Sequence, residues 1–178
     1  MKESTYKNMH LQMVRCWPLN PSALCSGPSA ERSYGQNQRS IFSFLTSGEP
    51  LGLRDFVNRS AAKPENIYDI SQLWDYLELN WGSSISVSGD SHHFANVRDA
   101  LSRLEAMEEA RLEHRYIIKA ISILELTEQL TGISATHEAL KIALNSTSHK
   151  ITRDLNFLTR NSLIILKKYK KTYALFEG

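Results

Sequence analysis

Basic and polar residues near the end of the sequence have the types and spacing needed to contact a nucleic acid. Residues 146–178 contain seven Lys and Arg against two acidic residues, a net charge of +5, whereas residues 1–145 carry a net charge of −3. This asymmetry makes the last segment a candidate for binding an anionic partner. The candidate DNA-contacting residues, whose side chains can bond bases or phosphates, are His149, Arg153, Asn156, Arg160, Lys167, Lys168, Lys170 and Lys171.

The elements that position these residues are predicted to form a winged helix, a variant of the helix-turn-helix. Apolar periodicity predicts three helices and then two strand-like runs, at about residues 112–130, 135–144, 146–160, 163–166 and 172–176. Three helices followed by a β-hairpin are the element order of a winged helix. When Ile151, Leu155 and Leu158 face the core, the candidate contacts of the third helix face outward.

Two interpretations of this unit stay open. A basic helix face beside a basic hairpin is typical of DNA-binding proteins, whose affinity falls as salt rises. However, winged helices also act as rigid spacers or protein-docking units. Lysines on an exposed hairpin can simply discourage edge-to-edge pairing of strands.

A second polar group opens a short predicted helix at residues 36–46. At 100° per residue, Arg39 lies opposite a broad apolar side formed by Ile41, Phe42, Phe44 and Leu45. The apolar side would anchor the helix, so that Arg39 points away from it toward a ligand or a neighbouring domain. In the alternative, Gln36 and Asn37 cap the helix and Arg39 is an ordinary solvated arginine or pairs with a nearby carboxylate.

The whole sequence predicts a mainly α protein, with a helical bundle before the winged helix. We divide it into an N-terminal extension, a lid-like helical domain and a winged-helix domain, at residues 1–19, 20–110 and 111–178. Within the helical domain, Gly27-Pro28 is expected to end a helix that begins at Asn20-Pro21. A loop is expected from Trp81, and the charge run at residues 105–113 is expected to be a solvated face.

Composition excludes several classes of protein. Apolar residues make up 42% and charged residues 22% of the 178 residues, the mixture of a soluble globular protein. We expect no membrane span, because no apolar run reaches the required length, and no secretory signal in the first 17 residues. Cys16 and Cys25 lack a histidine at ligand spacing, so no metal site is expected. These features favour a cytoplasmic protein with reduced cysteines.

Several segments of the sequence resemble one family. These are residues 19–24 (LNPSAL), 32–45 (RSYGQNQRSIFSFL), 49–56 (EPLGLRDF) and 173–178 (YALFEG). They are similar to large bacterial P-loop ATP-binding proteins that carry His-Pro, then Gln-Asn-Glu-Arg-Ser/Thr-x-Phe-x-Phe-Leu, then Glu-Pro after the nucleotide-binding core. The resemblance covers roughly residues 18–178. Gln38 stands where the family has an acidic residue, and Asn20 where it has histidine.

The resemblance implies that this chain corresponds to the helical lid and winged helix that follow an AAA+-like or STAND-like ATPase core. It also implies that Arg39, with Gln36 and Asn37, faces a nucleotide held by that core, since arginines in such enzymes stabilise the transferring phosphate. The chain has no G-x-x-x-x-G-K-[ST] loop and no strand ending in paired acids, so we expect no enzyme activity and no cofactor in this chain alone. ATP and magnesium are implied for the parent protein.

Three functions follow from these observations. The first is a non-catalytic lid and winged-helix segment that couples the nucleotide state of a P-loop ATPase core, in the same or another chain, to DNA or a protein partner. The second is a stand-alone winged-helix DNA-binding regulator with a helical effector or dimerisation domain. The third is a protein-interaction adaptor.

Overall fold

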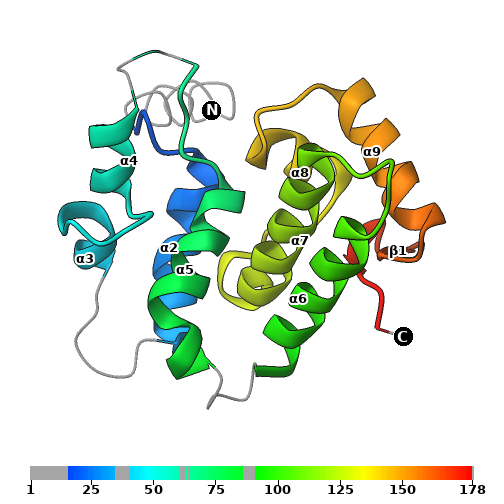
Figure 1. Ribbon diagram of the computed structural model, residues 1–178, viewed down its shortest axis with the longest axis horizontal. Helices are drawn as coiled ribbons and strands as arrows, with labels where there is room; N and C mark the ends of the chain where they lie inside the picture. The colour runs from blue at the N-terminus through cyan, green and yellow to red at the C-terminus, as the bar shows by residue number, and fades with distance from the viewer. Residues whose placement is uncertain (1–15, 35–40, 61–62, 64, 86–90, 178) are drawn as a thin grey trace, which may run out of the picture.

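The computed structural model describes residues 16–34, 41–60, 63, 65–85 and 91–177 (Figure 1). The described part is mainly helical and ends in a small antiparallel hairpin, which confirms the predicted fold class at that level. Its elements are α2 (Pro21–Tyr34), α3 (Ile41–Thr46), α4 (Leu53–Arg59), α5 (Ile70–Ile85), α6 (Ser91–Glu105), α7 (Leu112–Thr131), α8 (His137–Ala143), α9 (Ser148–Arg160), β1 (Ile164–Lys167) and β2 (Thr172–Leu175).

Helix α7 lies at the centre of the molecule, as Figure 1 shows. It packs against α2, α5, α6, α8, α9 and β2. This is why its apolar residues are buried almost all round, including Ile117, Ile118, Ile121 and Ile123. One continuous hydrophobic core therefore extends from Leu19 to Leu175. The domain boundary at residue 111 stays a prediction.

Helix α2 runs through Pro28, so the expected break at Gly27-Pro28 is wrong. Proline inside a helix removes one backbone hydrogen bond and crowds the preceding turn. The burial of Ala23, Ser26 and Ala30 along one side of α2 offsets this cost, because that side packs on α5 and α7. Local propensity was therefore overridden by tertiary packing.

Helix α2 also joins the front of the chain to the predicted winged helix. The Asn20 side chain accepts a hydrogen bond from the backbone N–H of Ser22 at 2.8 Å, as an N-cap does. The same side chain donates through Nδ2 to the carbonyl of Ile142, 3.0 Å away in α8. Asn20 thus links two segments 122 residues apart.

Aromatic rings hold α3 against Tyr68 and α5, and α4 against Tyr68 through Phe56, whose ring centroid is 5.4 Å away. Phe44 of α3 is 2% exposed and makes edge contacts with Tyr68 and Tyr76 at centroid distances of 5.4 and 5.0 Å. The Tyr68 hydroxyl donates to the carbonyl of Leu51 at 2.8 Å. The predicted apolar anchoring of the short helix is confirmed for Phe44. Helix α5 itself extends to Ile85, so the loop expected from Trp81 is wrong over its first five residues.

Residues 112–177 fold as three helices and the hairpin. Helix α7 ends at Gly132, whose φ of 69° is in the left-handed region that favours glycine. Thr136 and Thr147 are the N-caps of α8 and α9, and each side chain accepts from the backbone N–H three residues on. Strand β1 pairs with β2 from Ile164 opposite Leu175 to Lys167 opposite Thr172.

The segment between α7 and α8 lies along the free edge of β2. The backbone N–H of Tyr173 donates to the carbonyl of Ala135 at 2.8 Å, and Thr136 forms an antiparallel bridge with Thr172. These contacts fix the hairpin relative to α8, which in turn packs against α9. The hairpin and α9 are therefore held as one unit.

Candidate nucleic-acid interface

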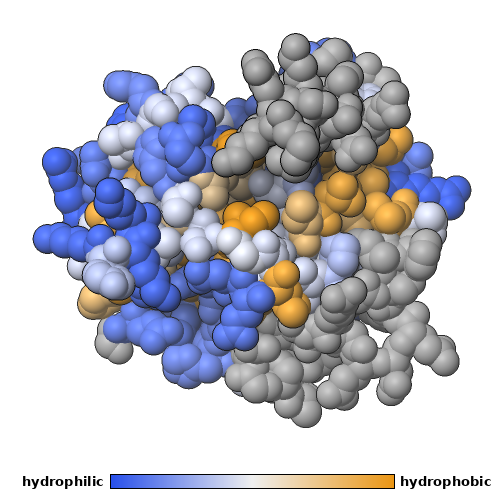
Figure 2. Space-filling view, turned by 180° about the vertical axis from the view of Figure 1, so that it is seen from behind, coloured by the Kyte–Doolittle hydropathy of each residue, from blue (hydrophilic) through white to orange (hydrophobic). Residues whose placement is uncertain are grey.

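Helix α9 presents a polar face to solvent, as the sequence predicts. Its apolar stripe, Ile151, Leu155 and Leu158, is at most 2% exposed. The predicted contacts on this helix are all exposed, namely His149, Arg153, Asn156 and Arg160. Figure 2 shows that the side of the molecule carrying α9 and the hairpin, on the left in that view, is mainly hydrophilic.

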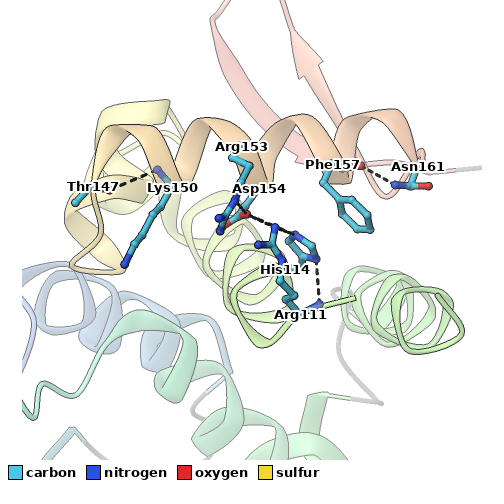
Figure 3. Close-up of polar contacts among 8 residues, drawn as sticks. All are labelled: Arg111, His114, Thr147, Lys150, Arg153, Asp154, Phe157 and Asn161. Atoms are coloured by element: carbon cyan, nitrogen blue, oxygen red, sulfur yellow. Dashed lines mark hydrogen bonds and ion pairs between the residues drawn. The ribbon is translucent and has the colours of Figure 1, made fainter. Parts of the chain in front are cut away.

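A buried carboxylate organises the middle of this face. Asp154 is 2% exposed, although it belongs to an otherwise polar helix. Its Oδ1 accepts from Nη2 of Arg111 at 2.7 Å and from Nε of Arg153 at 2.8 Å, and its Oδ2 accepts from Nη2 of Arg153 at 3.3 Å (Figure 3). Charge-assisted hydrogen bonds of this kind hold both guanidinium groups at the surface in fixed positions.

Beneath the two arginines lies the fully buried ring of His114. It stacks on Phe157 of α9, with ring centroids 4.1 Å apart and an interplanar angle of 6° (Figure 3). The backbone N–H of Arg111 donates to Nδ1 of His114 at 3.2 Å, and Nη2 of Arg111 lies 3.1 Å from Nε2 of the same ring. Burial lowers the pKa of His114, and the positive charge of Arg111 lowers it further.

The four lysines of the hairpin differ in whether they form an ion pair within the protein. Nζ of Lys167 lies 3.4 Å from Oε1 of Glu125 in α7, so this lysine is paired within the protein. Burial raises the pKa of Glu125, and the charge of Lys167 opposes that rise. The turn is fully exposed at Tyr169. Lys168, Lys170 and Lys171 are also exposed, with no ion pair to any other residue that the structure describes.

The structure places the predicted DNA contacts of α9 and those of the hairpin on one packed unit. It does not test the second predicted group, the residues expected to face a nucleotide. Gln36, Asn37 and Arg39 lie outside the described residues. Their proposed approach to a nucleotide stays a prediction.

The roles of Arg111 and Asp154 were not predicted from the sequence. Arg111 belongs to the charge run that we expected to be solvated, yet its side chain reaches Asp154, 43 residues away. A signal was present in the sequence, because Asp154 sits within the apolar stripe formed by Ile151, Leu155 and Leu158. An acid in such a stripe requires a cationic partner if it is buried.

Two other features bear on function. Among the residues described, no group of three or more His, Cys, Asp and Glu is arranged to hold a metal ion. No helix within the described ranges has the length and apolar character needed to cross a membrane.

No model of a protein family matches the sequence, and comparisons with curated proteins and with solved structures found no match.

Proposed function

We propose that residues 112–176 form a winged helix that binds double-stranded DNA, with α9 in the major groove and the hairpin on the phosphate backbone. The observation that carries this proposal is the exposed polar face of α9 beside the exposed lysines of the hairpin. The major groove admits an α-helix, and lysines beside it would contact phosphates. This assignment keeps the predicted DNA role and refines which residues perform it.

The packing supports a rigid interface. Three helices and a hairpin occur in the order of a winged helix, and the Ala135–Tyr173 hydrogen bond adds a third short strand-like segment to the hairpin edge. Because α9 and β1 are also packed together, a helix in the groove would place the turn at residues 168–171 over the backbone. Rigid presentation reduces the entropy lost on binding.

The residues divide into two kinds of contact. Asn156 is exposed near the middle of α9 and carries an amide that can bond adenine. Arg153 uses Nε and Nη2 on Asp154, which leaves Nη1 to donate to a base or a phosphate. Lys168, Lys170 and Lys171 are suited to phosphates, whereas Lys167 is engaged with Glu125.

The proposal is tested by fluorescence anisotropy of a labelled DNA duplex over a salt series. Replacing Lys168, Lys170 and Lys171 by alanine should weaken binding to every duplex sequence. It should also reduce the slope of log K against log salt by about 2.7, the value for three lost phosphate contacts. The Asn156→Ala variant should instead relax discrimination among sequences.

The matched control removes three exposed cations elsewhere, at Arg54, Arg59 and Lys63. This variant has the same net charge as the lysine variant but keeps the hairpin. If both triple variants lose affinity equally, binding is a general effect of net charge and the proposed interface is wrong.

We also propose, from the sequence resemblance, that the chain is the lid and winged-helix segment of a P-loop ATP-binding protein. In this role it is not itself an enzyme and couples the nucleotide state of an ATPase core to DNA or a protein partner. Helix α3, which follows Arg39 in the chain, is anchored through Phe44. This anchoring supports a role for Arg39 in contacting the ATPase core. A stand-alone DNA-binding regulator would use the same α9 interface, and gene context separates the two.

The lid role has its own test. In the parent protein, Arg39→Ala should lower ATP turnover, and unchanged turnover would remove Arg39 from the mechanism. The chain alone should show no detectable nucleotide binding, because it lacks a phosphate-binding loop. Binding of ATP by this chain with micromolar affinity would contradict the lid assignment.

A further inference from the structure

A hollow of about 490 Å³ lies between the start of α7 and the second half of α9. Three arginines and two asparagines line it, together with Phe157 and one acid, Glu109. The arginines are Arg111, Arg153 and Arg160, and the asparagines are Asn156 and Asn161. Residues from two segments more than 40 positions apart thus converge on one small space.

The charge of the hollow matches one anionic group. Arg111 and Arg153 share the single buried charge of Asp154, and neither forms an ion pair with any other described residue. Arg160 is exposed and has no ion pair with any described residue. With Glu109 included, the lining and Asp154 beneath it carry a net charge of +1. A phosphodiester, which carries one negative charge, would neutralise it.

The hydrogen-bonding groups also favour a phosphate. Guanidinium groups are donors with no acceptor, and a phosphate oxygen is an acceptor. Arg111 and Arg153 are fixed by Asp154, so their remaining N–H groups need little reorganisation to meet a ligand. Asn161 donates through Nδ2 to the carbonyl of Phe157 at 2.9 Å, which orients its amide at the edge of the hollow.

We infer that this hollow binds one phosphate group and that Arg160, Arg111 and Arg153 are its ligands. This site extends the proposed DNA interface beyond α9 to the start of α7. The inference that the phosphate comes from the DNA backbone rests on the proposed function. A phosphate held at this end of α9 would fix how deeply and in which direction the helix enters the groove.

The first experiment compares Arg160→Ala with Arg59→Ala, an exposed arginine in α4, in the duplex-binding assay. Arg160 is chosen because its removal leaves no described ion pair broken. We expect Arg160→Ala to weaken binding about tenfold and to reduce the salt slope by about 1, with Arg59→Ala close to wild type. Removal of the acid in the hollow by Glu109→Gln should strengthen binding, whereas Glu108→Gln, outside the lining, should not.

A second experiment needs no DNA. Inorganic phosphate is titrated into ¹⁵N-labelled protein, and the amide resonances of residues 156–161 are followed. Saturable shifts in the wild type that disappear in Arg160→Ala support the site. Comparison of duplexes with and without a 5′-phosphate identifies the source: equal affinity indicates an internal backbone phosphate, and preference for the 5′-phosphate indicates a terminal one.

The outcomes separate the two proposals. If duplex DNA binds but Arg160→Ala and Glu109→Gln behave as their controls, the phosphate site is wrong and the DNA-binding proposal stands. If DNA does not bind but inorganic phosphate shifts residues 156–161, the site stands and the DNA-binding proposal is wrong. If neither ligand binds, both proposals fail.

Discussion

The buried carboxylate of Asp154 makes a quantitative prediction for Arg111→Ala. The substitution removes the guanidinium that donates to Oδ1 at 2.7 Å, while Asp154 stays 2% exposed and retains Arg153. Removing one partner of a buried ion pair costs about 3–5 kcal/mol when no other partner remains. Because Arg153 remains and the Arg111 side chain is 41% exposed, we expect a smaller loss of about 1–3 kcal/mol in the free energy of unfolding.

The measurement is urea unfolding followed by circular dichroism, with Arg98→Ala as the matched control. Arg98 makes an exposed pair with Glu78 at 2.8 Å, which should contribute no more than about 1 kcal/mol. In a protein of this size, the Arg111→Ala loss corresponds to a Tm lower by roughly 2–12 °C.

A double-mutant cycle with Asp154→Asn assigns the effect to the pair. Because the two residues are in contact, their separate costs should not add in the double variant. If Arg111→Ala is no more destabilising than Arg98→Ala, or if the two costs are additive, Asp154 does not organise this face as described.

Three further predictions concern stability. The pKa of His114 is lowered from 6.5 in the folded protein, so on acidification the unfolded chain takes up a proton before the folded protein does. The free energy of unfolding should therefore fall as the pH falls below about 6.5. Arg111→Ala, which removes a cation near the ring, should weaken this pH dependence in unfolding curves recorded between about pH 7.5 and 5. Pro28→Ala should restore a hydrogen bond within α2 and raise the free energy of unfolding by up to about 3 kcal/mol; a lower value would mean that α2 depends on its proline geometry. Gly132→Ala should cost about 1–2 kcal/mol in the same assay because φ is 69° there, and an unchanged midpoint would contradict this conformation.

Periodicity in the sequence predicted the parts of the interface that depend on local structure. The outward face of α9 and the two strands of the hairpin follow from the spacing of Ile151, Leu155 and Leu158 and from the strand-like runs after them. Asp154 could not be assigned in the same way, because its partner Arg111 is 43 residues away and only the packing of α7 on α9 brings them together.

Two differences have the same physical origin. Helix α2 continues through Pro28 because its buried side packs on α5 and α7. The residues next to Pro28 in the sequence do not predict that packing. Lys167 looked equivalent to its neighbours on the hairpin, yet Glu125 of α7 lies within 3.4 Å of its amine. Sequence patterns therefore identified the outward face of α9, whereas long-range packing determined which charges on α9 and the hairpin form ion pairs within the protein.

The salt dependence of duplex DNA binding by the full chain tests the central proposal most directly. Three hairpin lysines and Arg160 would make four phosphate contacts, so log K should fall linearly with log salt with a slope of about −3.6. No binding at about 50 mM salt, or an affinity that does not change with salt, would contradict the assignment of α9 and the hairpin as a DNA interface.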